Sequence, residues 1–454
     1  MGLKKRLFAA AGIAAAAAAV IYVAAGSNVL PGVVPENVLT VKPTITLWYT
    51  DEALEDYLAS VSLDYLEEYG VRVMPVLKSG LEFLEAVNTA SIKNENAPDL
   101  YIVSNDCLEK AYLAGLASEI EDTDGVVTEE NFPAAALDAV CYQGKKVAYP
   151  LYFETSALVY NKTYLEQAAT EQGVTTESLI PETIDDILTF ADAYNAPETV
   201  EAVFKWDVSD IFYNYFFAGN YIDVGGPCGD DPGQIDIYNL EAVRGLKAYQ
   251  DLSQFFSIDA KTSSYEQVVQ DFLDGKLVFT VATTDIMTRI ADAVAAGKFP
   301  YEYGVVPLPD VNGEIRTKGL SVTNAAAVNG YSEKKEKANA FAAYLADVGA
   351  DKLYARTGRT PARLHVDNLQ PGMDGFVAEY AVAVPMPKMM STANFWVQME
   401  IACTKIWSGE NVSDILKSLS EAIMTQVTGT EYTEEEYIEV PSETETDFAD
   451  EGMD

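Results

Sequence analysis

The chain has 454 residues, of which 49% are hydrophobic, and its 70 acidic and 30 basic side chains give a formal net charge of −40. This length and apolar content suit two domains of ordinary size and lie far from a disordered composition. The acidic balance argues against nucleic acid as a partner, because contacts with phosphates need clusters of Lys and Arg.

The N-terminus has the pattern of an export signal. Basic residues at 4–6 precede an uncharged, alanine-rich run at 7–25. Small residues at 23–25 suit cleavage before Gly26, but the run is also just long enough to span a bilayer. Residues 1–26 are therefore expected to be a signal peptide or a retained N-terminal membrane anchor. No cysteine lies near the end of the run, so we expect no lipoprotein anchor, and the body of the protein should lie outside the cytoplasm.

After a proline-rich linker at 27–43, the next segments alternate between strand and helix patterns. We expect strands at 44–50, 71–77 and 99–105, with helices at 51–70, 80–93 and 106–115. Such a βαβαβ order predicts a parallel sheet. Ligands of parallel sheets lie beyond the carboxyl ends of the strands, which here read "WYTDE" and "VSND".

The second part of the chain is richer in helices. The expected helices are 183–193, 207–217, 241–256, 265–274, 285–298 and one around Trp396. The expected strands are 276–284, 301–309 and 321–329, and two helices should flank the segment "RTGRTPAR" at 356–363. The acidic, Thr-rich tail at 431–454 is expected to be disordered.

One residue departs from its surroundings. The stretch "VAYPLYFETSALVYNK" (147–162) has the composition of a buried strand, yet it contains Glu154. A buried carboxylate without a partner is costly. Glu154 should therefore lie at a surface, hold a partner or bind a ligand.

The cysteines and the single histidine limit the chemistry. His365 alone argues against a zinc site and against Ser-His-Asp catalysis. The cysteines fit no metal-binding spacing, and we expect buried thiols, although an extracytoplasmic chain could pair some of them; they are Cys107, Cys141, Cys228 and Cys403. We expect no cofactor.

The order of several loose motifs is more specific than any one of them. The motifs are "APDLYIVSNDCLEKAYLAGLASEIED", "VAYPLYFETSALVYNKTYLE", "FLDGKLVFTVATTDIMTRI", "YGVVPLP" and "ANFWVQMEIACTKIWSGE". In this order, after an export signal, they resemble the extracellular solute-binding proteins of ABC importers, of the maltose- and oligosaccharide-binding type (family 1). The resemblance covers about 44–428.

The resemblance implies an α/β, two-lobed periplasmic-binding-protein-like fold, with hinge-connected lobes and a cleft between them. Lobe one would comprise 44–152 plus 320–356, and lobe two 153–319 plus 357–430. Such lobes close on a ligand by a hinge motion. The first crossing between lobes would then fall within the stretch that contains Glu154.

The resemblance also implies a set of ligand-binding residues. Glu154 and Asp106 match acids that bind sugar hydroxyls, Asp51 and Glu52 match polar contacts at the end of the first strand, and Trp396 matches an aromatic that stacks on a sugar ring. Carboxylates accept several hydroxyl hydrogen bonds, and ring faces pack on pyranoses.

Departures from the family pattern leave the sugar open. Two tryptophans of the family's maltose binders correspond to Val103 and Asp285, so one stacking position has become a carboxylate. Four tyrosines of this chain could compensate, namely Tyr49, Tyr152, Tyr213 and Tyr221. Arg356 and Arg359 near the hinge could meet a carboxylate or sulfate group of a ligand.

Each candidate also has a structural interpretation. Asp51, Asp106 and Asp285 suit the N-terminal caps of the helices that follow them. Trp396 could be a core residue on a helix face, and Arg359 could pair with one of the many acids.

We therefore predict a monomeric, non-enzymatic substrate-binding component that captures a sugar or oligosaccharide and delivers it to an ABC permease. Three acids in the cleft leave a cationic solute, such as a polyamine, or a metal ion as the alternative, and a membrane-anchored sensor is another. An extracellular glycoside hydrolase would need paired carboxylates, but the sequence carries no catalytic signature.

Overall fold

The computed structural model describes residues 44–93, 95–256, 258–260, 263–367, 369–435 and 438. The expected signal or anchor, the linker and all but the first residues of the acidic tail lie outside this part. No helix among the described residues has the length and apolar content needed to cross a membrane.

The first half of the fold is the predicted parallel unit. Strand β1 (Thr44–Tyr49) lies between β2 (Arg72–Leu77) and β3 (Leu100–Ser104), with both pairings parallel. Between them run α2 (Glu55–Tyr69) and α3 (Phe83–Lys93), and α4 (Leu108–Leu113) follows β3. Helix α2 ends where Gly70 adopts a left-handed conformation, with φ of 72°, as its sequence predicts.

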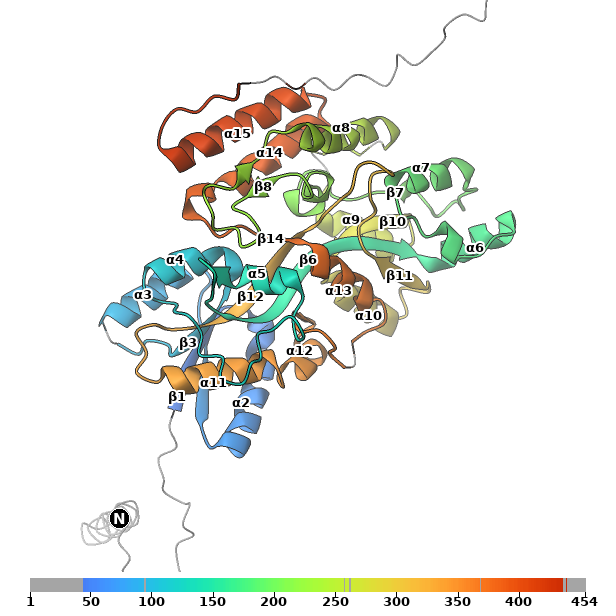
Figure 1. Ribbon diagram of the computed structural model, residues 1–454. Coiled ribbons are helices and arrows are strands. Elements are labelled where there is room, and N and C mark those ends of the chain that lie inside the picture. The colour runs from blue at the N-terminus through green and yellow to red at the C-terminus, as the bar shows by residue number, and fades with distance from the viewer. Residues whose placement is uncertain are drawn as a thin grey trace, which may run out of the picture.

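Strand β6 (Tyr149–Asn161) joins the two halves of the molecule. Its first part pairs antiparallel with β12 (Leu320–Val328), and its last part pairs with β10 (Leu277–Thr283) and β11 (Tyr303–Val306). In Figure 1 it runs from the lower half of the molecule into the upper half. The sheet order is β2-β1-β3-β12-β6-β10-β7, where β7 is Ala202–Phe204.

Two later short strands return to this central region. β13 (Thr360–Pro361) pairs with β6 at Phe153 and Tyr152, and β14 (Val384–Pro385) pairs with the start of β12. The chain thus passes several times between a lower and an upper α/β half, which is the predicted two-lobed architecture (Figure 1). The exact lobe boundaries remain a prediction.

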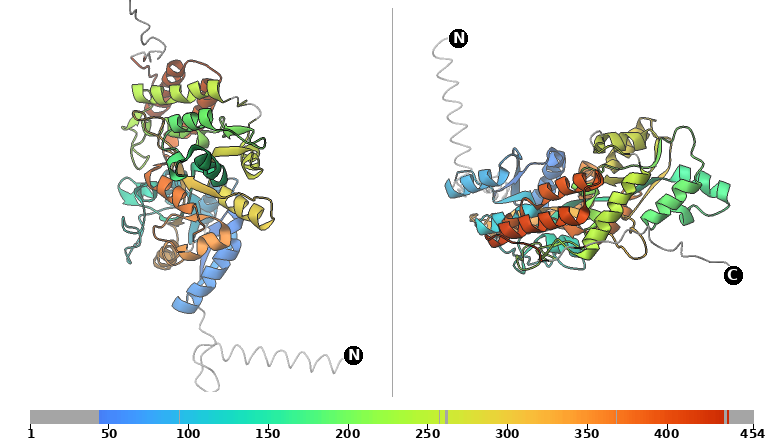
Figure 2. Two further views of the ribbon diagram at one scale, coloured as in Figure 1. Left: turned by 90° about the vertical axis from the view of Figure 1, so that its right-hand side faces the viewer. Right: turned by 90° about the horizontal axis from the view of Figure 1, so that it is seen from above.

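Helices cover both halves. The remaining elements before β10 are α5 (Ala134–Ala139), β4 (Cys141–Tyr142), β5 (Lys145–Lys146), α6 (Lys162–Gln172), α7 (Ile184–Ala193), β8 (Asp223–Val224), β9 (Ile235–Asp236), α8 (Leu240–Phe255) and α9 (Tyr265–Leu273). Those after it are α10 (Ile286–Ala295), α11 (Lys335–Ala346), α12 (Ala350–Thr357), α13 (Met373–Val382), α14 (Phe395–Trp407) and α15 (Val412–Thr428). Helices α8, α14 and α15 pack together at one end of the molecule (Figure 2).

The helix expected at 207–217 is wrong. The segment forms two short 3₁₀ turns, Ile211–Tyr213 and Tyr215–Phe217. The Asn214 side chain donates to the carbonyls of Asp207 and Asp210 and accepts from the Trp206 indole, while Asp210 accepts from Phe212 N. Such local side-chain bonds replace the helical hydrogen bonds.

The expected disordered tail does not begin at Glu431. The Glu434 side chain accepts from Ser420 on α15, its carbonyl accepts from Lys417, and Ile438 N donates to the Tyr238 hydroxyl. The first residues after α15 are therefore packed against the upper half.

Candidate functional site

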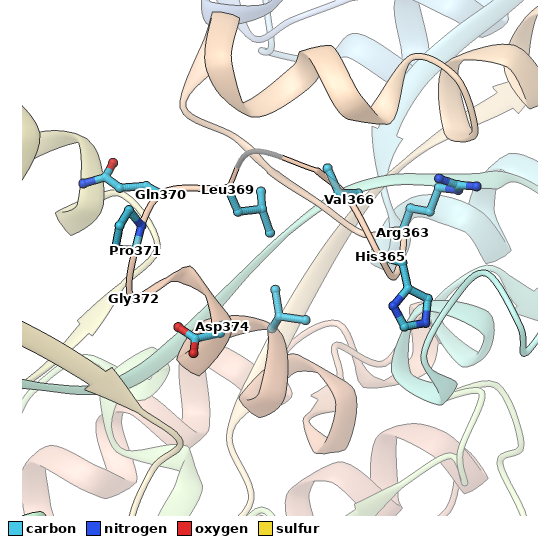
Figure 3. Close-up of a pocket in the computed structure, with 9 residues that line it drawn as sticks. Arg363, His365, Val366, Leu369, Gln370, Pro371, Gly372 and Asp374 are labelled. Carbon is cyan, nitrogen blue, oxygen red and sulfur yellow. The ribbon is translucent and has the colours of Figure 1, made fainter. Parts of the chain in front are cut away.

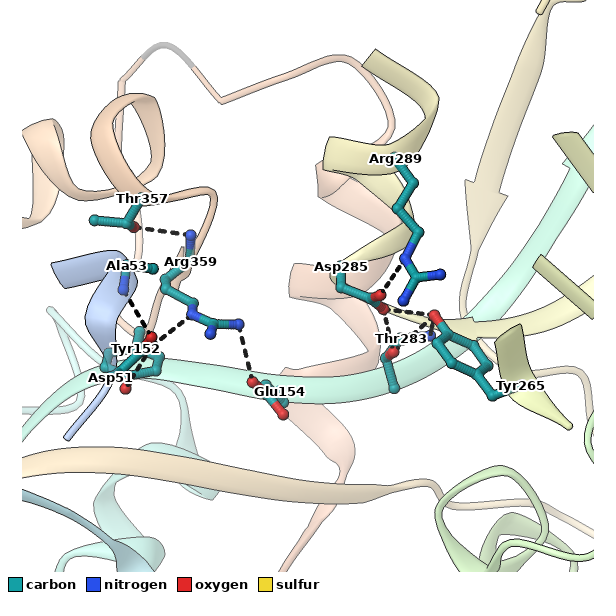
Figure 4. A network of polar contacts seen from close by, with 10 residues as sticks. All are labelled: Asp51, Ala53, Tyr152, Glu154, Tyr265, Thr283, Asp285, Arg289, Thr357 and Arg359. Carbon is teal, nitrogen blue, oxygen red and sulfur yellow. Dashed lines mark hydrogen bonds and ion pairs between the residues drawn. The ribbon is translucent and has the colours of Figure 1, made fainter. Parts of the chain in front are cut away.

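An ion pair joins the end of β1 to the segment between α12 and β13. Arg359 Nε lies 2.7 Å from Asp51 Oδ2, and the Tyr152 hydroxyl donates to the same oxygen at 3.3 Å (Figure 4). Asp51 Oδ1 accepts from Ala53 N at 3.1 Å, so the predicted cap is present as well. Asp51 thus caps a turn and also holds Arg359.

Glu154 faces the same guanidinium. Arg359 Nη1 lies 3.4 Å from Glu154 Oε1, and the two side chains are 31% and 41% exposed. Desolvation by the surrounding protein raises the pKa of Glu154, Arg359 lowers it, and the charges of Asp285 and Asp51 raise it, with a net upward shift. Arg359 thus contacts only one of the two carboxylate oxygens, at 3.4 Å. The carboxylate can therefore still accept hydrogen bonds from a ligand.

Asp285 is held by a second polar cluster. Its Oδ1 accepts from the Tyr265 hydroxyl and from Thr283 Oγ1, both at 2.5 Å, and its Oδ2 lies 2.8 Å from Arg289 Nε. Figure 4 shows this cluster on the same side of β6 as Arg359. Asp285 makes no side-chain cap bond to α10, so the cap interpretation is wrong for this residue.

Arg289 and Tyr265 extend the second cluster. Arg289 donates to both oxygens of Glu266 at 2.6 and 2.7 Å and lies over the Tyr265 ring. The Tyr265 ring stacks on Tyr213, with centroids 4.7 Å apart. The carboxylate of Asp285 is therefore paired with a cation, and the Tyr213–Tyr265 pair lies beside it.

Trp396 is partly buried near the start of α14. Its ring makes edge contacts with Tyr215 at 5.5 Å and with Phe395 at 5.0 Å between centroids. The structural interpretation as a residue packed against the core is thus correct in part, but some of the ring surface stays exposed. A partly exposed aromatic ring suits stacking on a ligand.

Asp106 lies in the 3₁₀ turn Asn105–Cys107 directly after β3 and caps no helix with its side chain. Its Oδ1 accepts from the Ser104 hydroxyl. The neighbouring Asn105 is buried and joins two segments, because its Nδ2 donates to Met386 O and its Oδ1 accepts from Thr323 N. Asp106 is therefore placed beside a contact between the lower half and the segment that follows β14.

Among the other predicted residues, two tyrosines are too buried for direct contact with a ligand. Glu52 is exposed, whereas Tyr49 is 3% exposed and packs in the core, so its side chain offers almost no surface to a ligand. Tyr152 is also buried, and it acts through Asp51. The Tyr221 hydroxyl accepts from Arg316 N and thereby holds the loop before β12.

A cavity of about 520 Å³ lies elsewhere, after β13 (Figure 3). His365, Leu369 and Asp374 are among its lining residues, and none of the predicted ligand-binding residues lines it. His365 itself adopts a left-handed conformation with φ of 57°.

The described residues contain no cluster of three or more His, Cys, Asp or Glu side chains that could hold a metal ion. Sequence reasoning missed Thr283, Tyr265 and Arg289, which hold Asp285. The spacing of Asp285 and Arg289, four residues apart at the start of a helix, was the available signal.

Comparison with known proteins agrees with this architecture. A family model described as bacterial extracellular solute-binding protein matches residues 64–381. The maltodextrin-binding protein MdxE of Bacillus subtilis (strain 168) is 25% identical over 367 residues, or 77% of this chain and 82% of that protein. The maltotriose-binding protein of Pyrococcus abyssi is 25% identical over 233 residues, which are 50% of this chain and 45% of that protein.

Solved structures share the fold. A Staphylococcus aureus extracellular solute-binding protein in complex with maltose gives a TM-score of 0.72 at 21% identity, over 85% of this chain and 98% of that one. The maltose-binding protein MalE of Listeria monocytogenes, also with maltose, gives 0.69 at 21% identity, over 87% and 100%. The family model covers most of the chain, and the chain belongs to the bacterial extracellular solute-binding protein family.

Proposed function

We propose that this protein captures a maltooligosaccharide between its two lobes and delivers it to the permease of an ABC importer. The observation that carries the proposal is the polar cluster on β6. There the half-exposed carboxylate of Glu154 stands beside the Arg359 guanidinium. Relatives named for maltodextrin and maltotriose support the class of ligand.

The cluster suits a neutral, polyhydroxylated ligand. A sugar hydroxyl both donates and accepts, so it can donate to a carboxylate and accept from a guanidinium at once. Glu154 and Arg359 together offer this combination, and Trp396, which is partly exposed, offers a ring for the apolar side of a pyranose.

The same geometry argues against the cationic solute and the metal ion. The alternative rests on three acids, Asp106, Glu154 and Asp285. Asp285 Oδ2 lies 2.8 Å from Arg289 Nε, and Glu154 Oε1 lies 3.4 Å from Arg359 Nη1, so two of these three acids already face a cation. A cationic ligand would have to compete with these guanidinium groups. A neutral sugar needs no such competition.

We also propose that the chain acts outside the cytoplasm as a monomer and binds its ligand without catalysis. Cleavage of residues 1–26 would release the protein from the membrane, and their retention would anchor it there. The family description as extracellular supports the location. Sequencing the N-terminus of the protein from its native source tests the anchor, because a start at Gly26 removes it and a start at Met1 or Gly2 retains it.

A thermal-shift screen of the full chain tests the ligand class. Maltose, maltotriose and maltotetraose should raise the unfolding midpoint in a concentration-dependent way, and the shift should change little between low and high salt. Spermidine and ferric citrate are the comparison ligands. Stabilisation by spermidine that disappears at high salt, without stabilisation by any saccharide, would contradict the proposal.

A further inference from the structure

Two cysteines that are distant in the sequence lie together. Cys141 belongs to β4, and Cys228 lies in the loop between β8 and β9, 87 positions later (228 − 141). Their side chains lie close enough to interact with each other, and both residues are partly exposed. Cys107 lies elsewhere, against Ser104, and Cys403 is fully buried.

The backbone around both thiols is fixed by contacts between the same two segments. Gln143 N, in the turn after β4, donates to Asp230 Oδ2 at 2.6 Å. Lys388 bridges the segments, because its Nζ donates to Asp138 O at 3.1 Å and to Cys228 O. The neighbouring contacts therefore hold the two thiols close together. Their proximity does not depend on the side-chain rotamers alone.

The turn at Cys228 is also tightly packed from outside. Gly229 has a φ of 62°, and a Cβ at this position would lie 2.7 Å from Pro387 Cα. Gly229 O accepts from Lys388 N at 3.0 Å. This packing leaves the loop little freedom to withdraw Cys228 from Cys141.

Lys388 also shapes the chemistry of the pair. Its side chain is buried, with 1% of the residue exposed, and its ammonium lies close to both thiols. The hydrogen bond with the Cys228 thiol and, to a smaller degree, the charge of Lys388 lower the pKa of Cys141. A lowered pKa favours the thiolate, which is the reactive form of a cysteine.

We propose that Cys141 and Cys228 are a disulfide-forming pair that ties the β4–β5 hairpin to the loop between β8 and β9. The oxidant is a disulfide, carried by a thiol oxidoreductase or by glutathione. The Cys141 thiolate attacks one sulfur of that disulfide and releases the other as a thiolate. Cys228, as its thiolate, then attacks the Cys141 sulfur and releases the second thiol of the oxidant. The two protons lost by the cysteines end on the two thiols formed, and the two electrons reduce the oxidant.

The position of the pair gives the link a structural consequence. Cys141 precedes β6 and Cys228 follows it, so the disulfide closes a long loop that contains the first passage between the two halves. Closing a long loop restricts the unfolded chain and raises stability. An extracellular family lies in the compartment where such bonds persist.

The test treats the full chain with glutathione disulfide, unfolds it, alkylates the remaining thiols and maps the peptides by mass spectrometry. Two of the four cysteines should be protected from alkylation, in one linked peptide pair containing Cys141 and Cys228. The unfolding midpoint of the oxidised protein should exceed that of the reduced protein by roughly 5 °C or more.

Matched serine variants distinguish this pair from other thiols. Cys107→Ser should keep the linked peptides and the shift in midpoint, because Cys107 is partly exposed but lies outside the pair. Cys141→Ser should lose both and should carry a glutathione adduct on Cys228. The proposal is overturned if all four thiols of the oxidised protein react with the alkylating agent, if Cys141 and Cys228 carry separate adducts, or if either pairs with Cys107.

Discussion

Asp51 and Arg359 are 308 positions apart in the chain, yet Arg359 Nε lies 2.7 Å from Asp51 Oδ2. The pair joins the end of β1 to the segment after α12, and the same guanidinium reaches Glu154 on β6. Three segments of the chain therefore meet at one cation. Glu154, which looked misplaced in an apolar strand, faces this cation on the strand that joins the two halves.

Replacing Glu154 by Gln should weaken the binding of maltotriose by at least about 1 kcal/mol, or roughly fivefold, because a charged acceptor is lost while the shape is kept. Isothermal titration calorimetry gives the affinity, and the unfolding midpoint should change little. Glu171→Gln is the matched control, since Glu171 is exposed on α6 and is not a predicted ligand-binding residue. Equal affinities of wild type and Glu154→Gln would remove Glu154 from the site.

Replacing Arg359 by Met leaves Asp51 and Glu154 without the cation between them. We expect a tenfold or larger loss of maltotriose affinity, because a hydrogen-bond donor to the ligand is lost and two carboxylates are left without their cation. Stability should fall by about 1 kcal/mol, a modest value because the pair is partly exposed to solvent. Urea unfolding measures the second effect. Arg244→Met, at an exposed position of α8, should show neither change.

Replacing Trp396 by Leu should lower maltotriose affinity by about 1 kcal/mol or more, because a ring face is lost. The fold should be retained, since the indole is only partly buried. The intrinsic fluorescence change on adding saccharide should also shrink. Val397→Ala, its exposed neighbour, is the control. A normal affinity in Trp396→Leu would show that the ring serves packing alone.

Glu379 should give the protein a specific pH dependence of stability. It is 2% exposed, it accepts from Leu308 N at 2.9 Å and Gly319 N at 3.1 Å, and burial raises its pKa to about 7. Between its ordinary pKa of 4.5 and about 7, the folded protein keeps a proton that the unfolded chain has released. Its contribution is thus complete below the lower value and is lost as pH rises through the upper one.

The variant Glu379→Gln isolates this contribution. The unfolding free energies of wild type and variant are measured in urea at pH 4.5 and pH 8. Relative to the variant, the wild type should lose about 2–3 kcal/mol of stability between the lower and the higher pH. A constant offset between the two proteins reflects the amide itself. A difference that does not change with pH would contradict the raised pKa.

Local patterns in the sequence predict the strands and most helices of this fold. Helix α2 is an example, because its apolar spacing and Gly70 define both its face and its end. The segment 207–217 could not be predicted from periodicity, since the Asn214 side chain binds the local backbone and prevents a helix.

The site was predictable only where a residue conflicts with its surroundings. Glu154 is a carboxylate in an apolar strand, so the sequence alone marks it. Its partner Arg359 lies 205 positions away, and no local pattern connects the two. The same holds for Asp285, whose partner Tyr265 belongs to another helix. Tyr49 shows the converse error, because the alternation of a strand does not tell which side of the sheet faces a ligand.

A calorimetric titration of the full chain with maltotriose tests most directly whether the protein binds a neutral oligosaccharide. We expect saturable binding of one saccharide per chain, with an affinity that depends little on salt. The absence of measurable binding of maltotriose, together with saturable binding of spermidine under the same conditions, would contradict it.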